Sequence, residues 1–150
     1  MKLRNAIITD IPHIQSLINH YATQGLMLPR SLNSLYGGIQ ELIVAEKEGT
    51  LAGVGALHVV WDDLAEIRSL AIAPQYAKNG LGSRIVNALV EKAADLGVPK
   101  VFTLTYQPGF FTKCGFHEIS KDELPNKIWK DCLDCVKFPN CDETAMLKKV

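Results

Sequence analysis

The chain has 150 residues, of which 47% are hydrophobic and 21% are charged. This length suits one domain with a core of its own, and the composition excludes a disordered acidic tail and a collagen-like repeat. Sixteen basic residues balance sixteen acidic ones, so net charge favours neither nucleic acid nor an anionic membrane as a partner. Without a membrane-length apolar run or a signal-peptide pattern, we expect a cytoplasmic protein with a single domain, residues 1–150.

The balanced total hides two blocks of opposite charge. Residues 41–66 carry six acidic side chains and one lysine, a local charge of −5. Residues 67–113 carry six basic and two acidic side chains, a local charge of +4. We expect the basic block to hold anionic groups.

The N-terminal half predicts a strand, helices and then a run of strands. A strand over 3–8 precedes a helix that begins after Thr9-Asp10 and closes at Gly25. A second helix is expected around residues 32–39. Three strands follow, over 42–46, 51–60 and 66–73, and their short connections favour an antiparallel meander.

The C-terminal half alternates helices and strands. Pro74 ends the third strand, and a long amphipathic helix runs from Gly80 to Gly97. A strand over 101–105, a short helix over 108–114 and a strand over 116–119 precede a long loop and a last strand near 144–148. This order predicts an α+β fold, a mixed and mostly antiparallel central sheet covered by helices on both faces.

The turn between the third strand and the long helix has the form of an anion-binding site. Glycines at 80 and 82 let phosphate oxygens approach the backbone N–H groups at the start of the helix. Lys78 and Arg84 add positive charge. The Gly-x-Gly spacing alone is equally typical of an ordinary strand-turn-helix, and the third glycine of a Rossmann fingerprint is absent.

Several segments together resemble a known family. The acetyl-CoA-binding core of GNAT-type N-acetyltransferases is similar to five segments of this chain, over residues 3–119: the strand end at 71–76, the turn at 78–82, the long helix, the strand at 101–105 and the segment 110–116. The resemblance implies acetyl-CoA as co-substrate, with its pyrophosphate at the turn and its pantetheine along the preceding strand. One departure is Ala77, where the family usually has Arg or Gln. The coenzyme-binding residues implied are Leu70, Ala71, Ile72, Ala77, Lys78, Asn79, Gly80, Leu81, Gly82, Ser83, Arg84, Phe111 and Lys113.

A finer resemblance lies outside the coenzyme segments. Residues 25–31, 55–58, 65–71, 104–106 and 132–141 look like the single-domain N-acetylglutamate synthases of bacterial arginine biosynthesis. This similarity implies transfer of acetyl to the α-amine of L-glutamate by direct attack of the amine on the thioester.

Glutamate carries two carboxylates, which the planar fork of arginine binds well. Arg30 and Arg68 are therefore the candidate substrate cations. The alternatives are a structural ion pair of Arg68 with Glu66, two residues away on the same strand face, and a surface role for Arg30. Lys127 and Lys130 in the long loop are further candidates. The predicted substrate site is Leu28, Arg30, Ser31, Arg68 and Tyr106.

Acetyl transfer needs a base for the amine and a proton for the departing thiolate. Glu66 resembles the strand glutamate that serves as general base in other GNAT branches, with Glu46 as second choice. A backbone N–H near Ile72 is expected to hold the oxyanion. The family's usual acid is a tyrosine whose position is Phe111 here, so Tyr106 is the candidate acid, with a core tyrosine as the alternative.

The cysteines leave three readings open. Cys132, Cys135 and Cys141 form half of a zinc pattern, and the second pair of ligands is missing. We therefore predict packed thiols and no metal, with a labile disulfide or a metal as the alternatives. The expected partner is a small-molecule substrate, with no nucleic acid or membrane, and a homodimer is left open. Rival functions are acetylation of glutamine or another small amine, a non-catalytic acyl-CoA-binding regulatory module, and a metal-dependent interaction module.

Overall fold

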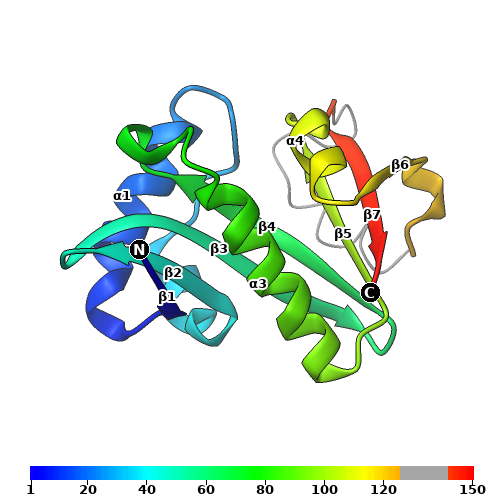
Figure 1. Ribbon diagram of the computed structural model, residues 1–150, viewed down its shortest axis with the longest axis horizontal. Coiled ribbons are helices and arrows are strands. Elements are labelled where there is room, and N and C mark those ends of the chain that lie inside the picture. The colour runs from blue at the N-terminus through cyan, green and yellow to red at the C-terminus, as the bar shows by residue number, and fades with distance from the viewer. Residues whose placement is uncertain (126–141) are drawn as a thin grey trace. The chain divides into compact units, whose positions relative to one another are not determined.

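The computed structural model describes residues 1–125 and 142–150 (Figure 1). The N-terminal half holds β1 (Lys2–Asn5), α1 (Ile11–Ala22), α2 (Leu32–Gly37), β2 (Leu42–Lys47), β3 (Thr50–Trp61) and β4 (Leu64–Ile72). The C-terminal half holds α3 (Leu81–Leu96), β5 (Lys100–Thr105), α4 (Pro108–Lys113), β6 (His117–Ile119) and β7 (Thr144–Lys149). Short 3-10 turns are η1 (Ile8–Asp10), η2 (Ile39–Glu41), η3 (Pro74–Tyr76) and η4 (Lys121–Glu123). Each predicted helix and strand is present, in the predicted order.

The first strand is shorter than the prediction, which extended it to Ile8. β1 ends at Asn5, the Ile7 N–H donates to Asp10 Oδ2 at 2.7 Å, and the Asp10 N–H donates to the Ile7 carbonyl at 2.9 Å. These two bonds close the turn η1 and take Ile7 and Ile8 out of the sheet. Both isoleucines are exposed, so the apolar character that favoured a strand is not used in the core.

The strands form a seven-stranded sheet in the order β1-β2-β3-β4-β5-β7-β6. Among the strand pairs whose register is described, β4 and β5 are parallel over residues 64–66 and 100–102. The described pairs β1·β2, β2·β3, β5·β7 and β6·β7 are antiparallel. The predicted mixed, mostly antiparallel sheet is confirmed.

The chain divides into two compact units, one of residues 1–58 and 67–92 and one of residues 59–66 and 93–150. The first unit holds β1, β2, α1, α2 and most of β3, α3 and β4. The second unit holds the start of β4 together with β5, α4, β6 and β7. In neither unit do the described residues form a helix long and apolar enough to cross a membrane.

In the first unit, α1 covers one face of the sheet. Its sequence places isoleucines one helical turn apart, and all three are fully buried. They pack against even-numbered residues of β3, which point to one face because side chains alternate along a strand. The residues of this contact are Ile11, Ile14, Ile18, Val54 and Ala56.

The opposite face of β3 receives α3. Gly53 and Gly55 point to this face, and a Cβ added to Gly55 would lie 2.8 Å from Ile85 Cγ2 and 2.9 Å from Leu89 Cδ1 of α3. Side chains of α3 therefore occupy the space that a larger side chain at Gly53 or Gly55 would need. Helices cover both faces of this part of the sheet, as predicted.

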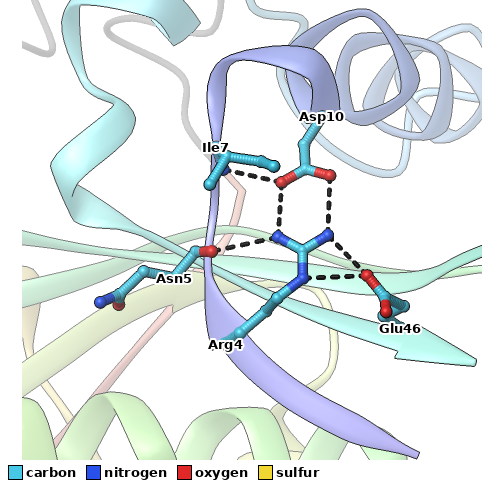
Figure 2. Close-up of polar contacts among 5 residues, drawn as sticks. All are labelled: Arg4, Asn5, Ile7, Asp10 and Glu46. Atoms are coloured by element: carbon cyan, nitrogen blue, oxygen red, sulfur yellow. Dashed lines mark hydrogen bonds and ion pairs between the residues drawn. The ribbon is translucent and has the colours of Figure 1, made fainter. Parts of the chain in front are cut away.

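A charged cluster joins β1, β2 and the start of α1 (Figure 2). Arg4 Nη1 and Nη2 donate to the two carboxylate oxygens of Asp10 at 2.7 and 3.0 Å. Arg4 Nε and Nη2 donate to Glu46 Oε2 at 2.9 and 2.7 Å. The hydrogen bonds to Asp10 and Glu46 raise the pKa of the Arg4 guanidinium, and the hydrogen bonds from Arg4 lower the pKa of Asp10. The cluster thus fixes where the chain turns from the edge strand into the helix.

The second unit is built around β5 and β7. Phe102 of β5 is fully buried and packs with Leu64, Leu124 and Ala145. β7 pairs with β5 on one side and with β6 on the other, so that Met146 lies opposite both Thr103 and Glu118. The last strand of the chain therefore completes the centre of this unit.

Candidate active site

The turn that precedes α3 has the geometry of an anion-binding site. Gly80 has φ +73°, a conformation that favours glycine, and a Cβ added there would meet nothing within 4 Å. The Arg84 N–H donates to the Gly80 carbonyl at 3.2 Å, which places the N–H groups of Leu81 and Gly82 before the helical hydrogen-bond ladder. Such N–H groups and the positive end of the helix attract phosphate.

The end of β4, which leads into this turn, is anchored by two hydrogen bonds. The Ala73 N–H donates to the Ala52 carbonyl of β3 at 2.8 Å. The Tyr21 hydroxyl of α1 donates to the Ile72 carbonyl at 2.5 Å. Sequence reasoning did not single out Tyr21 and missed this polar contact. The two bonds fix the backbone that is predicted to meet the pantetheine.

Arg30, one of the predicted substrate residues, is held in place by several hydrogen bonds. Its Nε and Nη2 donate to Ser34 Oγ at 3.2 and 2.9 Å, and Nη2 also donates to the Ser34 carbonyl at 3.2 Å. Its Nη1 donates to Ser69 Oγ of β4 at 3.3 Å. Ser31 caps α2 by accepting the Ser34 N–H at 3.0 Å, which fixes the residue that holds the guanidinium. The fork is thereby aimed at β4.

The surroundings of Arg30 favour an anion. Burial lowers the pKa of the Arg30 guanidinium, and the like charge of Arg68 lowers it further. The negative charge of Glu41 raises it. Two arginines close enough to repel each other form a place where a carboxylate gains from both. Ser69, which contacts Arg30, has φ +56°, a strained conformation of the kind found at functional sites.

Glu41 and His58 are parts of this site that sequence reasoning missed. His58 Nδ1 lies 2.7 Å from Glu41 Oε2. Burial alone would raise the pKa of Glu41, but His58, Arg68 and Arg30 together lower it. Lys92 of α3 also interacts with the charge of Glu41, and burial lowers the pKa of the Lys92 ammonium group. No motif marks these residues, because they come together only through the fold.

The predicted site residues fall in both units. The first unit contains Leu28, Arg30, Ser31, Arg68, Leu70, Ala71, Ile72, Ala77, Lys78, Asn79, Gly80, Leu81, Gly82, Ser83 and Arg84. The second unit contains Glu66, Tyr106, Phe111 and Lys113. Their roles remain predictions.

In the second unit, the candidate acid Tyr106 lies just after β5 and donates its hydroxyl to Asp142 Oδ1 at 2.6 Å. Phe111, which stands at the position of the family's usual acid, is buried and packs edge-to-face on Phe110 and Phe116. Glu66, the candidate base, is half-buried on β4 opposite Phe102 of β5. Phe111 therefore acts as a core residue in this unit.

Two further predictions concern Glu46 as the second-choice base and the cysteines as thiols or metal ligands. Glu46, the second-choice base, accepts both Arg4 hydrogen bonds on one oxygen, which argues for a structural role. Cys114 is buried. Cys132, Cys135, Cys141, Lys127 and Lys130 lie outside the described residues. Among residues 1–125 and 142–150, no group of three or more His, Cys, Asp or Glu side chains is arranged to hold a metal.

Comparison with known proteins identifies the class of protein that this fold and turn define. Residues 17–116 match the acetyltransferase (GNAT) family, and the chain belongs to that family. It is an acetyltransferase that uses acetyl-CoA as co-substrate, as the sequence predicts.

Individual relatives narrow the comparison. The chain is 38% identical over 146 residues to an uncharacterized N-acetyltransferase of Chlorobaculum tepidum, covering 97% of this chain and 94% of that protein. It is 42% identical over 132 residues to an amino-acid acetyltransferase of Mycobacterium tuberculosis, covering 86% of this chain and 75% of that protein. An amino-acid acetyltransferase of Neisseria meningitidis is 37% identical, and the match covers 87% of this chain but only 30% of that protein.

Solved structures agree with these similarities. A Mycobacterium tuberculosis protein in complex with CoA and NLQ matches with a TM-score of 0.89 and 33% identity, over 100% of this chain and 99% of that one. An N-acetylglutamate synthase from Neisseria gonorrhoeae, complexed with coenzyme A and N-acetyl-glutamate, matches with a TM-score of 0.90 and 32% identity, over 99% of this chain and 34% of that one. The predicted resemblance to N-acetylglutamate synthases is confirmed.

Proposed function

We propose that the chain transfers the acetyl group of acetyl-CoA to the α-amine of L-glutamate, the first step of arginine biosynthesis. The observation that carries the proposal is the Arg30 fork, which Ser34 holds and which points its Nη1 at Ser69 in the electrostatic neighbourhood of Arg68. A fixed pair of cations suits an acceptor that carries carboxylates. The relatives named amino-acid acetyltransferase support an amino-acid acceptor.

The proposal gives most of the predicted residues a role. The backbone of residues 77–84 binds the coenzyme phosphates, and residues 70–72 bind the pantetheine. Leu28 and Ser31 line the acceptor site beside Arg30. Residues 1–150 act as one acetyltransferase domain, and the enzyme works in the cytoplasm, where its two substrates are available.

In the proposed reaction, the neutral amine attacks the thioester carbonyl carbon, so that a C–N bond forms and the C–S bond breaks. Glu66 accepts the proton that the amine must lose, and a backbone N–H near Ile72 stabilises the oxyanion. The thiolate leaves with a proton from Tyr106 or from solvent. Because a thiol has a pKa of about 8.5, the leaving group needs little assistance from an acid.

Steady-state release of coenzyme A, measured with each amino acid in turn, tests the proposal. We expect glutamate to give the highest kcat/KM, and Arg30→Ala to raise the KM for glutamate by tenfold or more, on the order of the loss of one charge-assisted bidentate contact. Arg30→Lys keeps the charge without the fork and should recover only part of the loss. Lys2→Ala, an exposed change on β1, is the matched control that should leave both constants unchanged.

Each rival gives a different result in this assay. A higher kcat/KM with glutamine or another amine, together with an Arg30→Ala KM for glutamate equal to that of the wild type, contradicts glutamate as the acceptor. Coenzyme binding by calorimetry without turnover on any amine indicates a non-catalytic module.

A further inference from the structure

Glu41 places a resident carboxylate beside the arginine that is proposed to bind the acceptor. Its Oε2 lies 2.7 Å from His58 Nδ1. Its Oε1 faces Gly38, where an added Cβ would lie 3.5 Å from Oε1 and 3.2 Å from Arg30 Nη2. The Glu41 carboxylate and the Arg30 fork thus border the same position, the open side of Gly38.

The position of Glu41 creates a competition for Arg30. An arginine fork pairs with any carboxylate within reach, and partial burial strengthens the attraction. Glu41 is itself half-buried, at 29% side-chain exposure, and it is charged at neutral pH because its pKa is lowered. A Glu41 side chain free to turn would pair with Arg30 and take the place of an acceptor carboxylate.

Several charged groups surround Glu41, but one of them holds it by a hydrogen bond. Arg30 precedes α2, Arg68 lies on β4 and Lys92 lies on α3, and all three act on Glu41 through charge. Lys92 Nζ is directed elsewhere, because it donates to the Gln40 carbonyl at 2.7 Å. His58 lies on β3, and its Nδ1 makes the 2.7 Å hydrogen bond to the Glu41 carboxylate. His58 therefore fixes one oxygen of the Glu41 carboxylate.

We propose that His58 is a positioning residue that holds Glu41 away from Arg30, so that the Arg30 fork remains available to the acceptor carboxylate. The inference rests on the proposed function, since it requires an acceptor that carries a carboxylate. The bond needs a proton on Nδ1 of the imidazole. Asparagine carries an N–H donor at a similar distance from the backbone, whereas leucine carries none.

Four variants test this role: His58→Leu, His58→Asn, Glu41→Gln and the double variant His58→Leu with Glu41→Gln. We measure the Kd of glutamate and of glutarate by calorimetry with coenzyme A present, and the KM and kcat for glutamate. His58→Leu should raise the Kd and KM for glutamate about tenfold, and His58→Asn should stay within about twofold of the wild type. The double variant should return to near the wild-type Kd, since the competing carboxylate is gone. The KM for acetyl-CoA and the kcat should not change.

A matched control is His117→Leu, which removes an exposed strand histidine from β6 and should change none of these constants. An unchanged Kd in His58→Leu, or a double variant as weak as His58→Leu alone, overturns the inference. If His58→Leu does not fold, Glu41→Gln decides, because it should bind glutamate at least as tightly as the wild type, and weaker binding overturns the inference.

The two proposals fail in different ways. Wild-type protein that binds glutarate but does not acetylate glutamate contradicts the proposed function. The ratio of the glutarate Kd of each variant to that of the wild type then still tests the role of His58. Wild-type protein that acetylates glutamate but has the same Kd in all four variants contradicts only the role of His58. Wild-type protein that binds neither dicarboxylate overturns both.

Discussion

Arg4 uses five side-chain hydrogen bonds to hold together residues from three parts of the chain. Two carboxylates, those of Asp10 and Glu46, share its guanidinium. Their oxygens would repel each other without it. The network explains why Glu46, which sequence reasoning considered as a base, has a structural partner instead.

Replacing Arg4 by methionine should lower the free energy of unfolding by about 1–2 kcal/mol at neutral pH, because two half-buried carboxylates lose their shared donor. Urea unfolding measures the change. Lys2→Met, which removes a positive charge from an exposed position of the same strand, is the control and should change stability by less than about 0.5 kcal/mol.

The same variant should respond differently to acid. The hydrogen bond from Arg4 lowers the pKa of Asp10 in the folded state, so this stabilisation is present above the unfolded pKa of about 3.9 and is lost as pH falls toward the folded pKa. Unfolding midpoints between pH 7 and pH 3 should therefore fall more steeply in the wild type than in Arg4→Met. Parallel curves would contradict the assigned role of the pair.

At the scale of elements, the close approach of α3 to β3 positions the turn before α3, the predicted site of the coenzyme phosphates. The helix starts at the turn and lies on Gly53 and Gly55, which leave its Ile85 and Leu89 room against the strand. Periodicity predicted the helix and the strand separately. It did not predict their contact, because a glycine in a strand equally indicates a bulge or a weak strand.

Gly55→Ala should destabilise the protein by about 1–3 kcal/mol, because its Cβ would overlap two α3 side chains and force the helix to move. Gly37→Ala is the matched control: its Cβ would meet nothing within 4 Å, and it lies in α2, so the change should be neutral or slightly stabilising. Thermal and urea unfolding of both variants measure the difference. Equal stabilities would show that α3 accommodates the extra methyl without strain.

At the scale of the whole molecule, the two charge blocks differ in how their charges are used. The basic block, residues 67–113, contains the turn before α3. The acidic block, residues 41–66, is neutralised in part by distant residues: Glu46 by Arg4, Asp63 by Lys100 at 3.5 Å, and Glu41 by His58. The basic block carries a net charge of +4, which favours an anionic ligand at this turn.

Coenzyme A should raise the thermal midpoint of the chain in a concentration-dependent way. A ligand at 100 times its Kd adds about 2.7 kcal/mol of stability, which corresponds to roughly 5–10 °C for a chain of this size. Pantetheine, which lacks the phosphates, is the control ligand and should give a much smaller shift at equal concentration. Equal shifts would show that the turn before α3 does not bind the phosphates.

The sequence by itself determined the order of helices and strands, the class of fold and the family. These features depend on local spacing: isoleucines one turn apart in α1, a proline after β4 and glycines in the turn before α3. Glycine and proline restrict the backbone at their own positions, and apolar periodicity selects helix or strand within a few residues. One boundary was wrong for a clear reason, at Ile7 and Ile8, where the hydrogen bond from the Ile7 N–H to the Asp10 side chain outweighed apolar character.

Only the tertiary structure decided which polar groups meet. Arg4 with Glu46, Tyr21 with Ile72 and His58 with Glu41 are separated by 42, 51 and 17 residues. Nothing in their local sequence distinguishes them from other charged or aromatic residues. The physical reason is that a hydrogen bond depends on distances of about 3 Å between atoms, and the packing of whole elements sets those distances.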